Sequence, residues 1–523
     1  MTDPYRVVAY RDMFPGLDIV STWTYTNNDP KLMHYIETLR ATTRSTGQQP
    51  MQTVTLLNYP GVLAPKQTPS PEGTDPAHEG WMLMGPDRCK EVSWIILSRA
   101  PKNIGYYFSS ACNPENYSRP EDQFRVPHAT SLAIKDLSDR VYQPYGPMIT
   151  RIRSAPRSIA MLSSQVSRLY NRSPRTIGYP NEQIYGFYSV MAHLNADILL
   201  DEQVEAGELE NYDVLVMPRC EVITESMLKH IQAFQQRGGK VLSDQHLGPK
   251  LSHVIQFDFD FSYRLKVNAD AIESGVMYAE WDDQLNADTE KLTAAQGITA
   301  EDDQKIMESY VRQLQEKLAD QVEPEVAVDT PTSLVNVLEK NGVKYLVLVN
   351  DKRTYGDRVG KYKAILEDSV PQKVTVTVRA WDGPLHAYNM LQRRLLPTTL
   401  DKDGFSFPVE LTELGGTIVA LYPEELGEIS VSVPGSIKRG ESATVAVTIS
   451  DKNGRLLDGL QPLRVTLTDT TGKSSSYSGY YCAENGKFDL PFLPATNDVP
   501  GSWEISVEEL TAGMSAEKTF EVR

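Results

Sequence analysis

The pattern of apolar residues changes once along the chain, and this change constrains the fold more than any other feature. Before residue 331, short β-branched runs such as 18–25 and 52–58 alternate with stretches of helical periodicity such as 30–46. Alternation of this kind predicts parallel strands joined by right-handed crossovers. After residue 331, short strands follow one another between Asp, Gly and Pro turns. We therefore predict a multidomain chain with α/β units first and all-β units last.

The first α/β unit is predicted to span 1–125. Its strands are expected at 18–25, 52–58 and 103–109, with a helix between each pair, and a helical connector follows at 126–157. Three parallel strands cannot close a barrel, whose smallest parallel form has eight. We therefore predict that this unit is the final, partial section of a TIM barrel.

A second α/β unit is predicted at 158–330, as an open, doubly wound, flavodoxin-like domain. A polar helical insertion is expected near 286–320, and a helix at 224–237 ends at paired glycines, which accept left-handed backbone cheaply. Two β-sandwiches are predicted after it, at 331–426 and 427–523. The strands expected in the last three domains include 159–163, 197–200, 212–217, 240–243, 343–350, 373–378, 416–421, 443–449, 463–468 and 501–507.

Charge and composition narrow the range of partners. A net charge of −17 disfavours nucleic acid and anionic membranes, because their phosphates would be repelled. The sequence has no apolar run long enough to cross a bilayer and no charged-then-apolar leader, so we expect neither a membrane span nor a signal peptide. The four cysteines and eight histidines lack metal-type spacing, and there is no glycine-rich phosphate loop. We predict no metal, no cofactor and no disulfide framework.

Several short stretches, taken in order, resemble one family. Residues 89–107 look like the last helix and strand of a barrel, 211–218 with 225–243 look like half of a class I glutamine amidotransferase-like domain, and 383–389 with 415–421 look like a following sandwich. Residues 486–488 and 500–503 look like an immunoglobulin- or macroglobulin-type module. This order resembles the clan A glycoside hydrolases, and most closely the relatives of the family 42 β-galactosidases. The resemblance implies a trimerisation role for 158–330.

The resemblance also implies where catalytic groups belong. In clan A the acid/base follows the fourth barrel strand and the nucleophile follows the seventh. If the N-terminal strands are barrel strands six to eight, the acid/base is expected to lie ahead of Met1. Asn58 and Tyr59 then stand where the nucleophilic glutamate is expected, and an amide cannot replace a carboxylate there. Glu79 is the candidate catalytic carboxylate, and its alternative role is that of a solvated loop residue.

Aromatic and amide side chains near the strand ends form the candidate substrate site. Barrel sites lie at the carboxyl ends of the strands, and aromatic faces stack on sugar rings. The alternative is that these aromatics pack in the core. The candidate substrate-binding residues are Trp23, Tyr25, Asn58, Tyr59, Trp81 and Tyr107.

Cys220 follows the strand predicted at 212–217. The turn that best matches the amidotransferase nucleophile is 243–249, which holds no cysteine. A thiol is reactive only where a base or a positive group stabilises the thiolate. Arg219 could do this, but we expect Cys220 to be a buried thiol of a scaffold domain.

Three hypotheses follow from these observations. The chain is part of a glycoside hydrolase acting on oligo- or polysaccharide, a non-catalytic carbohydrate-binding scaffold with a degenerate barrel, or an assembly module that forms homotrimers through 158–330. The expected partner is carbohydrate. An extracellular or periplasmic location is expected for the full-length parent. The chain as given is expected not to hydrolyse aryl glycosides.

Overall fold

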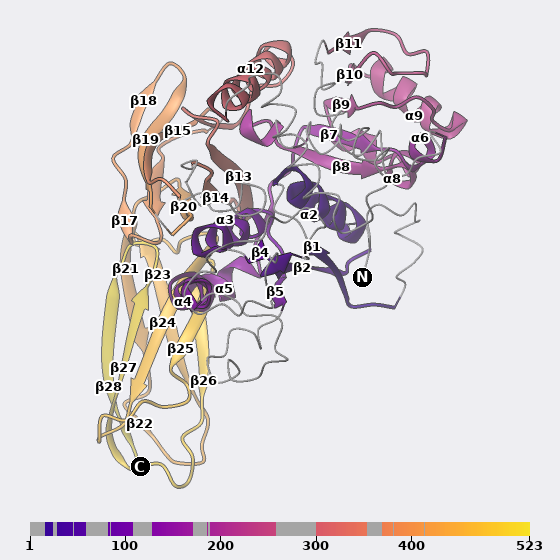
Figure 1. The fold of residues 1–523 in the computed structure, drawn as a ribbon. Coiled ribbons are helices and arrows are strands. Elements are labelled where there is room, and N and C mark those ends of the chain that lie inside the picture. Colours follow the sequence, from indigo (N-terminus) through magenta and orange to yellow (C-terminus); the bar gives the residue numbers. More distant parts are fainter. Residues whose placement is uncertain are drawn as a thin grey trace, which may run out of the picture.

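The computed structural model describes most of the chain in twelve segments, and the account that follows is confined to them. The described residues are 16–24, 29–44, 46–58, 82–83, 85–107, 128–170, 186, 189–257, 300–352, 369–379, 381–412 and 414–523. Six sheets and a series of helices are arranged along the chain from α/β to all-β (Figure 1). The prediction of a mixed α/β and β-rich chain is confirmed.

The first unit is a parallel three-stranded sheet with the order β1-β2-β5, which we call the three-stranded unit together with its helices. Thr22 and Val54 are buried on the face of the sheet toward the helices, where Leu32 and Ile36 of the first helix join the same core. The elements are β1 (Ile19–Thr24), α2 (Asp29–Arg44), β2 (Gln49–Thr55), α3 (Pro86–Leu97) and β5 (Asn103–Tyr107), beside a short antiparallel pair, β3 (Leu57–Asn58) and β4 (Met82–Leu83).

The connector is helical except at its end. It consists of α4 (His128–Leu137), a π-helical turn η4 (Ser138–Tyr142) and α5 (Gln143–Ile149), followed by β6 (Arg153–Ser154). The prediction of helix throughout 126–155 is wrong for Arg153 and Ser154. These two residues form β6, which pairs with β13 far along the chain and extends the six-stranded sheet.

The second unit, which we call the five-stranded unit, is a parallel sheet. Across the sheet its strands lie in the order β8-β7-β9-β10-β11. Its strands are almost entirely buried, as expected for a parallel sheet covered on both faces. The elements are β7 (Ile159–Ser163), α6 (Gln165–Tyr170), β8 (Ala196–Leu200), α8 (Asp201–Glu205), η5 (Glu208–Asn211), β9 (Val214–Met217), α9 (Glu225–Gln236), β10 (Lys240–Ser243) and β11 (Val254–Gln256).

Helix α9 has a clear start and end in the sequence. The Thr224 hydroxyl accepts the Met227 N–H at 3.1 Å, which satisfies one of the unpaired donors of the first turn. Gly238, at φ +101°, ends the helix. A helix is also predicted at 181–195; the structure describes 186 and 189–195 of this stretch, and of these 186 and 189–191 are helical. Of the polar segment at 286–320 the structure describes one helix, α12 (Ala300–Leu318).

Two antiparallel sheets then face each other across one apolar core. A four-stranded sheet has the order β12-β15-β19-β18, and a six-stranded sheet has the order β17-β16-β20-β14-β13-β6. Their strands are β12 (Val326–Val328), β13 (Ser333–Lys340), β14 (Val343–Asn350), β15 (Gln372–Val378), β16 (His386–Asn389), β17 (Arg394–Leu395), β18 (Thr399–Asp401), β19 (Gly404–Leu411) and β20 (Gly416–Tyr422).

The C-terminal strands pair in an eight-stranded arrangement, drawn in yellow at the lower left of Figure 1. Phe492 packs between Trp503 and Phe520 in its core, with its ring centroid 5.7 Å from that of each. The strands are β21 (Leu426–Ser432), β22 (Ser436–Ile437), β23 (Ala443–Asp451), β24 (Leu460–Thr468), β25 (Gly479–Glu484), β26 (Lys487–Phe492), β27 (Gly501–Glu509) and β28 (Ser515–Val522).

The units are in direct contact and share packed side chains. Trp94 of α3 is fully buried against Gly415 and Gly416, and its indole N–H donates to the Leu414 carbonyl at 2.8 Å. The Tyr145 hydroxyl of α5 donates to the Met390 carbonyl at 2.6 Å. One apolar cluster runs from α2 through α3 and α5 into the five-stranded, six-stranded and C-terminal sheets. The described part of the chain therefore has a continuous core.

Candidate functional site

The carboxyl ends of β1, β2 and β5 meet at one edge of the three-stranded sheet. Trp23 pairs with Thr53, which pairs with Gly105, and two residues further along Thr55 pairs with Tyr107. This in-register arrangement brings the predicted strand ends together, where an enzyme of barrel type would place its site.

Tyr106 and Tyr107 lie on opposite faces of β5, as the pleat requires. The Tyr106 hydroxyl lies 2.7 Å from the Ser93 hydroxyl of α3 and 2.5 Å from the Tyr142 hydroxyl of η4. Burial raises the pKa of Tyr142 to about 12 and raises that of Tyr106 well above its ordinary value, so both phenols stay protonated. Because Tyr106 is fixed on the helix side, Tyr107, which is half-buried, belongs to the other face.

That second face, which we call the inner face, includes Met51, Gly105 and Tyr107, and Trp23 belongs to it by its pairing with Thr53. Ile19 is 44% exposed, Met51 is half-buried, and Gly105 has no side chain. A Cβ on Gly105 would lie 2.7 Å from Met51 Cε and 3.1 Å from Thr53 Oγ1, so the glycine lets its neighbours lie flat across it. None of the described residues of this face is a carboxylate. The described part of the inner face supplies no acid/base pair.

The other predicted site residues stand as follows. Tyr25, Tyr59, Glu79 and Trp81 lie outside the described residues, so their predicted roles stay predictions. Trp23 is placed in β1 by its backbone only. Asn58 is likewise placed only as a strand residue, paired with Met82 in the β3–β4 ribbon rather than continuing β2.

The carboxyl edge of the five-stranded sheet holds Cys220, which is 1% exposed. Its Sγ lies 3.6 Å from the Pro218 carbonyl. Arg219, the residue before it, has φ +47°; its N–H donates to Asp244 at 2.8 Å, and its guanidinium donates to Glu221 at 3.2 Å. The positive neighbour of the thiol is therefore engaged with a carboxylate. An enclosed thiol cannot reach a substrate, in agreement with a scaffold role.

The loops at this edge also close on one another. The Ser167 hydroxyl donates to the Val222 carbonyl at 2.5 Å, and the Gly248 N–H donates to the Cys220 carbonyl at 3.1 Å. A Cβ on Gly248 would lie 1.9 Å from the Glu221 carbonyl oxygen, so only glycine permits this approach. In open α/β sheets a ligand binds in the crevice beyond the strand ends. Here segments that follow β7, β9 and β10 are hydrogen-bonded to one another beyond the strand ends.

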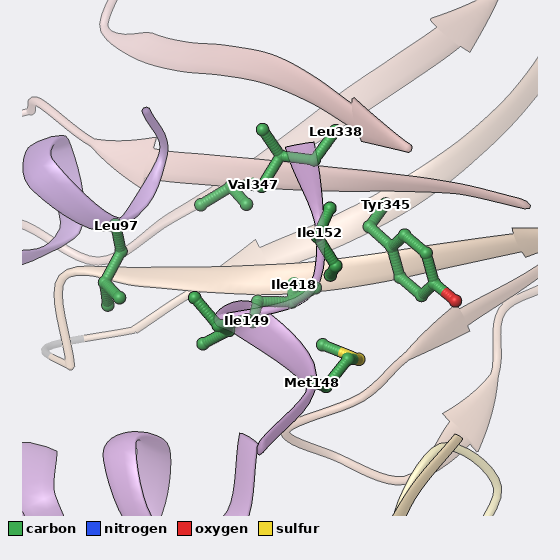
Figure 2. Close-up of a pocket in the computed structure, with 8 residues that line it drawn as sticks. All are labelled: Leu97, Met148, Ile149, Ile152, Leu338, Tyr345, Val347 and Ile418. Atoms are coloured by element: carbon green, nitrogen blue, oxygen red, sulfur yellow. The ribbon is translucent and has the colours of Figure 1, made fainter. Parts of the chain in front are cut away.

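A small cavity lies where the helices meet the six-stranded sheet (Figure 2). It measures about 10 Å³, which is at most the space of one water molecule. Its walls are almost wholly apolar, so it is a packing gap rather than a ligand site. The lining residues are Leu97, Met148, Ile149, Ile152, Leu338, Tyr345, Val347 and Ile418.

The described residues contain neither a metal-binding group of side chains nor a membrane-spanning helix. No group of three or more His, Cys, Asp or Glu side chains within them could hold a metal ion. No helix in the same residues is both long and apolar enough to cross a membrane.

The sequence did not reveal a highly charged buried site among the described residues. Glu37, Arg99, Arg157 and Asp197 meet between the two α/β units with little exposure to solvent. The one local signal is Glu37 with Arg40, three positions apart on α2 amid apolar residues. The other members come from distant parts of the chain and carry no shared pattern.

Comparison of the sequence with models of protein families and with curated protein sequences finds no match. Solved structures with a similar arrangement include α-L-fucosidase isoenzyme 2 from Paenibacillus thiaminolyticus, at a TM-score of 0.44 and 12% identity over 74% of this chain and 62% of that one. A β-galactosidase from Bacillus circulans sp. alkalophilus gives a TM-score of 0.44 at 12% identity, over 77% and 60%. An exo-carrageenase of family GH42 from Bacteroides ovatus gives 0.34 at 11%, over 64% and 39%. The chain spans less than two thirds of each of these structures.

Proposed function

We propose that this chain is part of a protein related to the clan A glycoside hydrolases, of β-galactosidase-like type, and that it binds oligo- or polysaccharide on the inner face of the three-stranded sheet. The observation that carries the proposal is the inner face itself: an uncharged, partly open surface at the carboxyl ends of parallel strands, with Tyr107 and Gly105 side by side in register with Thr55 and Thr53. Sugar rings stack on aromatic side chains across such surfaces.

The arrangement of the remaining units supports the same relationship. The three-stranded sheet has the strand order of consecutive barrel strands, β1-β2-β5, with helices between them. The five-stranded sheet has the order 2-1-3-4-5 along its own strands, which is the flavodoxin-like order. The facing four- and six-stranded sheets fit a β-sandwich, and the C-terminal strands fit an immunoglobulin-like module. We propose the domain boundaries 1–125, 126–157, 158–330, 331–426 and 427–523 on this basis.

Binding, rather than cleavage, is the activity proposed for residues 1–523. A retaining glycosidase needs two carboxyl groups about 5–5.5 Å apart, and the described inner face offers none. Glu79 stays the candidate for a single catalytic carboxylate. We expect measurable saccharide binding and no turnover of aryl β-galactosides.

Affinity electrophoresis in gels containing galactan, with calorimetry on galacto-oligosaccharides, tests the proposal. Tyr107→Ala should weaken binding by about tenfold, the loss of roughly 1.4 kcal/mol that one stacked aromatic supplies. Tyr481→Ala, which changes a partly exposed tyrosine of the C-terminal sheet, is the matched control and should leave binding unchanged. Equal retardation of Tyr107→Ala and the unmodified protein would refute the site. Turnover abolished by Glu79→Gln would refute binding without cleavage.

A second candidate function is assembly, because segments beyond the strand ends of the five-stranded unit are hydrogen-bonded to one another. Closure by Ser167 and Gly248 leaves that unit a structural rather than a ligand-binding part. We propose homotrimer formation through 158–330. Light scattering coupled to size exclusion should give three times the chain mass, and a monomer across the micromolar range would sink the assembly role.

A further inference from the structure

Five charged side chains from four separate segments meet in the interior between the α/β units. Glu37 and Arg40 lie on α2, Arg99 follows α3, Arg157 precedes β7, and Asp197 lies on β8. None of these side chains is more than 15% exposed. We call this set the Glu37 cluster.

Glu37 is the centre of the cluster. Arg157 Nη1 lies 3.2 Å from each carboxylate oxygen of Glu37, and Arg99 Nη1 lies 3.2 Å from Oε1. Arg40 donates to the same carboxylate from the next turn of α2. Three guanidinium groups therefore surround one carboxylate, two of them from outside its own helix.

Asp197 is the second carboxylate, contributed by the five-stranded unit. Arg157 Nη1 lies 3.1 Å from its Oδ1 and Arg40 Nη2 lies 3.6 Å from the same oxygen. At the rim, Arg44 Nη1 lies 3.4 Å from Asp197 Oδ2. Since Arg40 and Arg44 belong to α2 and Asp197 belongs to β8, these ion pairs cross from one unit to the other.

Two asparagines connect the cluster to the six-stranded sheet through hydrogen bonds. Asn195 Oδ1 accepts from Arg99 at 2.9 Å, while its amide nitrogen donates to the Val335 carbonyl at 2.9 Å. Asn336 Oδ1 accepts from Arg157 at 3.1 Å. Amide oxygens at the contact with β13 thus accept one donor of Arg99 and one of Arg157.

Such a cluster makes separation of the units costly. A buried ion is tolerated only when its partners stay in place, because an uncompensated charge in a low-dielectric interior is strongly unfavourable. If α2 moved away from β8, Asp197 would keep Arg157 as a partner but would lose Arg40, and Arg40 would lose Asp197. No single ion can leave at low cost, and this distinguishes the cluster from an exposed ion pair.

We propose that the Glu37 cluster is a latch that makes the three-stranded unit and the five-stranded unit open and unfold as one body. The proposal is independent of saccharide binding. It states a mechanical property: neither unit exposes its core while the other stays closed.

Two buried thiols give a readout for each unit separately. Cys89 lies on α3 in the three-stranded unit at 0% exposure, and Cys220 lies in the five-stranded unit at 1%. The full chain is pulsed with iodoacetamide across a urea series, and mass spectrometry of the peptides gives the labelling midpoint of each cysteine. In the unmodified protein the two midpoints should coincide.

Glu37→Gln removes the central charge at nearly constant volume and should separate the two midpoints, because it removes the ion pairs that couple the units. A matched thermal scan should show a fall in Tm on the order of 10 °C, the scale expected when one member of a buried ion pair is lost. Arg157→Lys, which keeps the charge but loses the two-pronged contact, should separate the midpoints by a smaller amount and serves if Glu37→Gln does not fold.

Glu339→Gln is the control, because Glu339 pairs at 3.4 Å with an Arg153 side chain that is 79% exposed. It should move neither midpoint. Separate midpoints in the unmodified protein would overturn the latch. So would a Glu37→Gln variant whose two midpoints still coincide.

Discussion

The guanidinium of Arg157 meets the carboxylate of Glu37 across 120 positions of sequence, with Nη1 3.2 Å from both carboxylate oxygens. Burial alone would raise the pKa of Glu37, but the guanidinium groups of Arg157, Arg40 and Arg99 outweigh it and hold that pKa at about 2, below the ordinary value of 4.5. The folded chain therefore binds this proton more weakly than the unfolded chain does.

The sign of the resulting pH dependence is fixed. A carboxyl whose pKa is depressed by folding stabilises the fold above its unfolded value and loses that contribution as the pH falls. We expect Glu37 to contribute on the order of 3 kcal/mol at pH 7, lost between about pH 5 and pH 2. Urea midpoints of the unmodified protein and Glu37→Gln, measured at pH 7 and pH 3, should converge at the lower pH. A difference that stays constant with pH would contradict this assignment.

A buried histidine joins the five-stranded unit to the next sheets. His193 Nδ1 accepts the Val328 N–H at 3.4 Å, so Nε2 carries the proton and donates to the Ser333 carbonyl at 3.2 Å. Burial lowers the pKa of His193 to about 4, against the hydrogen bond to Ser333, which raises it. The unfolded chain is then protonated between pH 6.5 and 4 while the folded chain is not, so stability falls as the pH drops through that window.

His193→Asn tests this second titration. Asparagine keeps a donor and an acceptor and tolerates the φ of +61° at this position. We expect the variant to lose the part of the acid destabilisation between pH 6.5 and 4 that is due to His193, about 3 kcal/mol. His253→Asn is the matched control, since His253 has φ +54° but is exposed. An unchanged pH profile in His193→Asn would show that His193 is not the titrating group.

The regular elements were predictable where local pattern decides them. The strand Val343–Asn350 was predicted with the bounds that the structure has, because its β-branched and apolar run is buried between neighbours on both sides. The helix at α9 was predicted from Thr224 and the paired glycines that follow it. Parallel pairing of β1, β2 and β5 followed from the alternation of strand and helix.

What could not be predicted depends on residues far apart in the chain. The Glu37 cluster draws on positions 37, 99, 157 and 197, and no spacing rule joins them before the units pack. The addition of β6 to the six-stranded sheet likewise depends on a two-residue strand too short to show a pattern. At the candidate site, the strand predicted at 103–109 made Tyr107 a candidate, but the role of Gly105 is visible only from its neighbours Met51 and Thr53.

Glycine at position 416 fixes how α3 docks on the six-stranded sheet. A Cβ there would lie 2.5 Å from Trp94 Cδ2 and 2.6 Å from the Leu348 carbonyl oxygen, and neither the buried indole nor the strand backbone can move cheaply. We expect Gly416→Ala to destabilise the chain by about 1–3 kcal/mol, the usual cost of overpacking a core. Urea unfolding followed by tryptophan fluorescence measures it. Gly435→Ala, with nothing within 4 Å, should change the midpoint little, and equal effects of the two variants would contradict the packing argument.

Cys220 should behave as a structural thiol even though it follows a strand end as a nucleophile would. A reactive cysteine needs both access and a stabilised thiolate, whereas this one is 1% exposed and its cationic neighbour Arg219 is bound to Glu221. We expect no alkylation of Cys220 by iodoacetamide under native conditions and full alkylation beyond the urea midpoint, read from its peptide by mass spectrometry. Cys220→Ala should cost about 1 kcal/mol, and Cys220→Ser more, because a hydroxyl costs more to bury than a thiol and Cys220 is buried. Rapid native labelling would mean that the loops around Cys220 open, and the scaffold role of the five-stranded unit would then have to be given up.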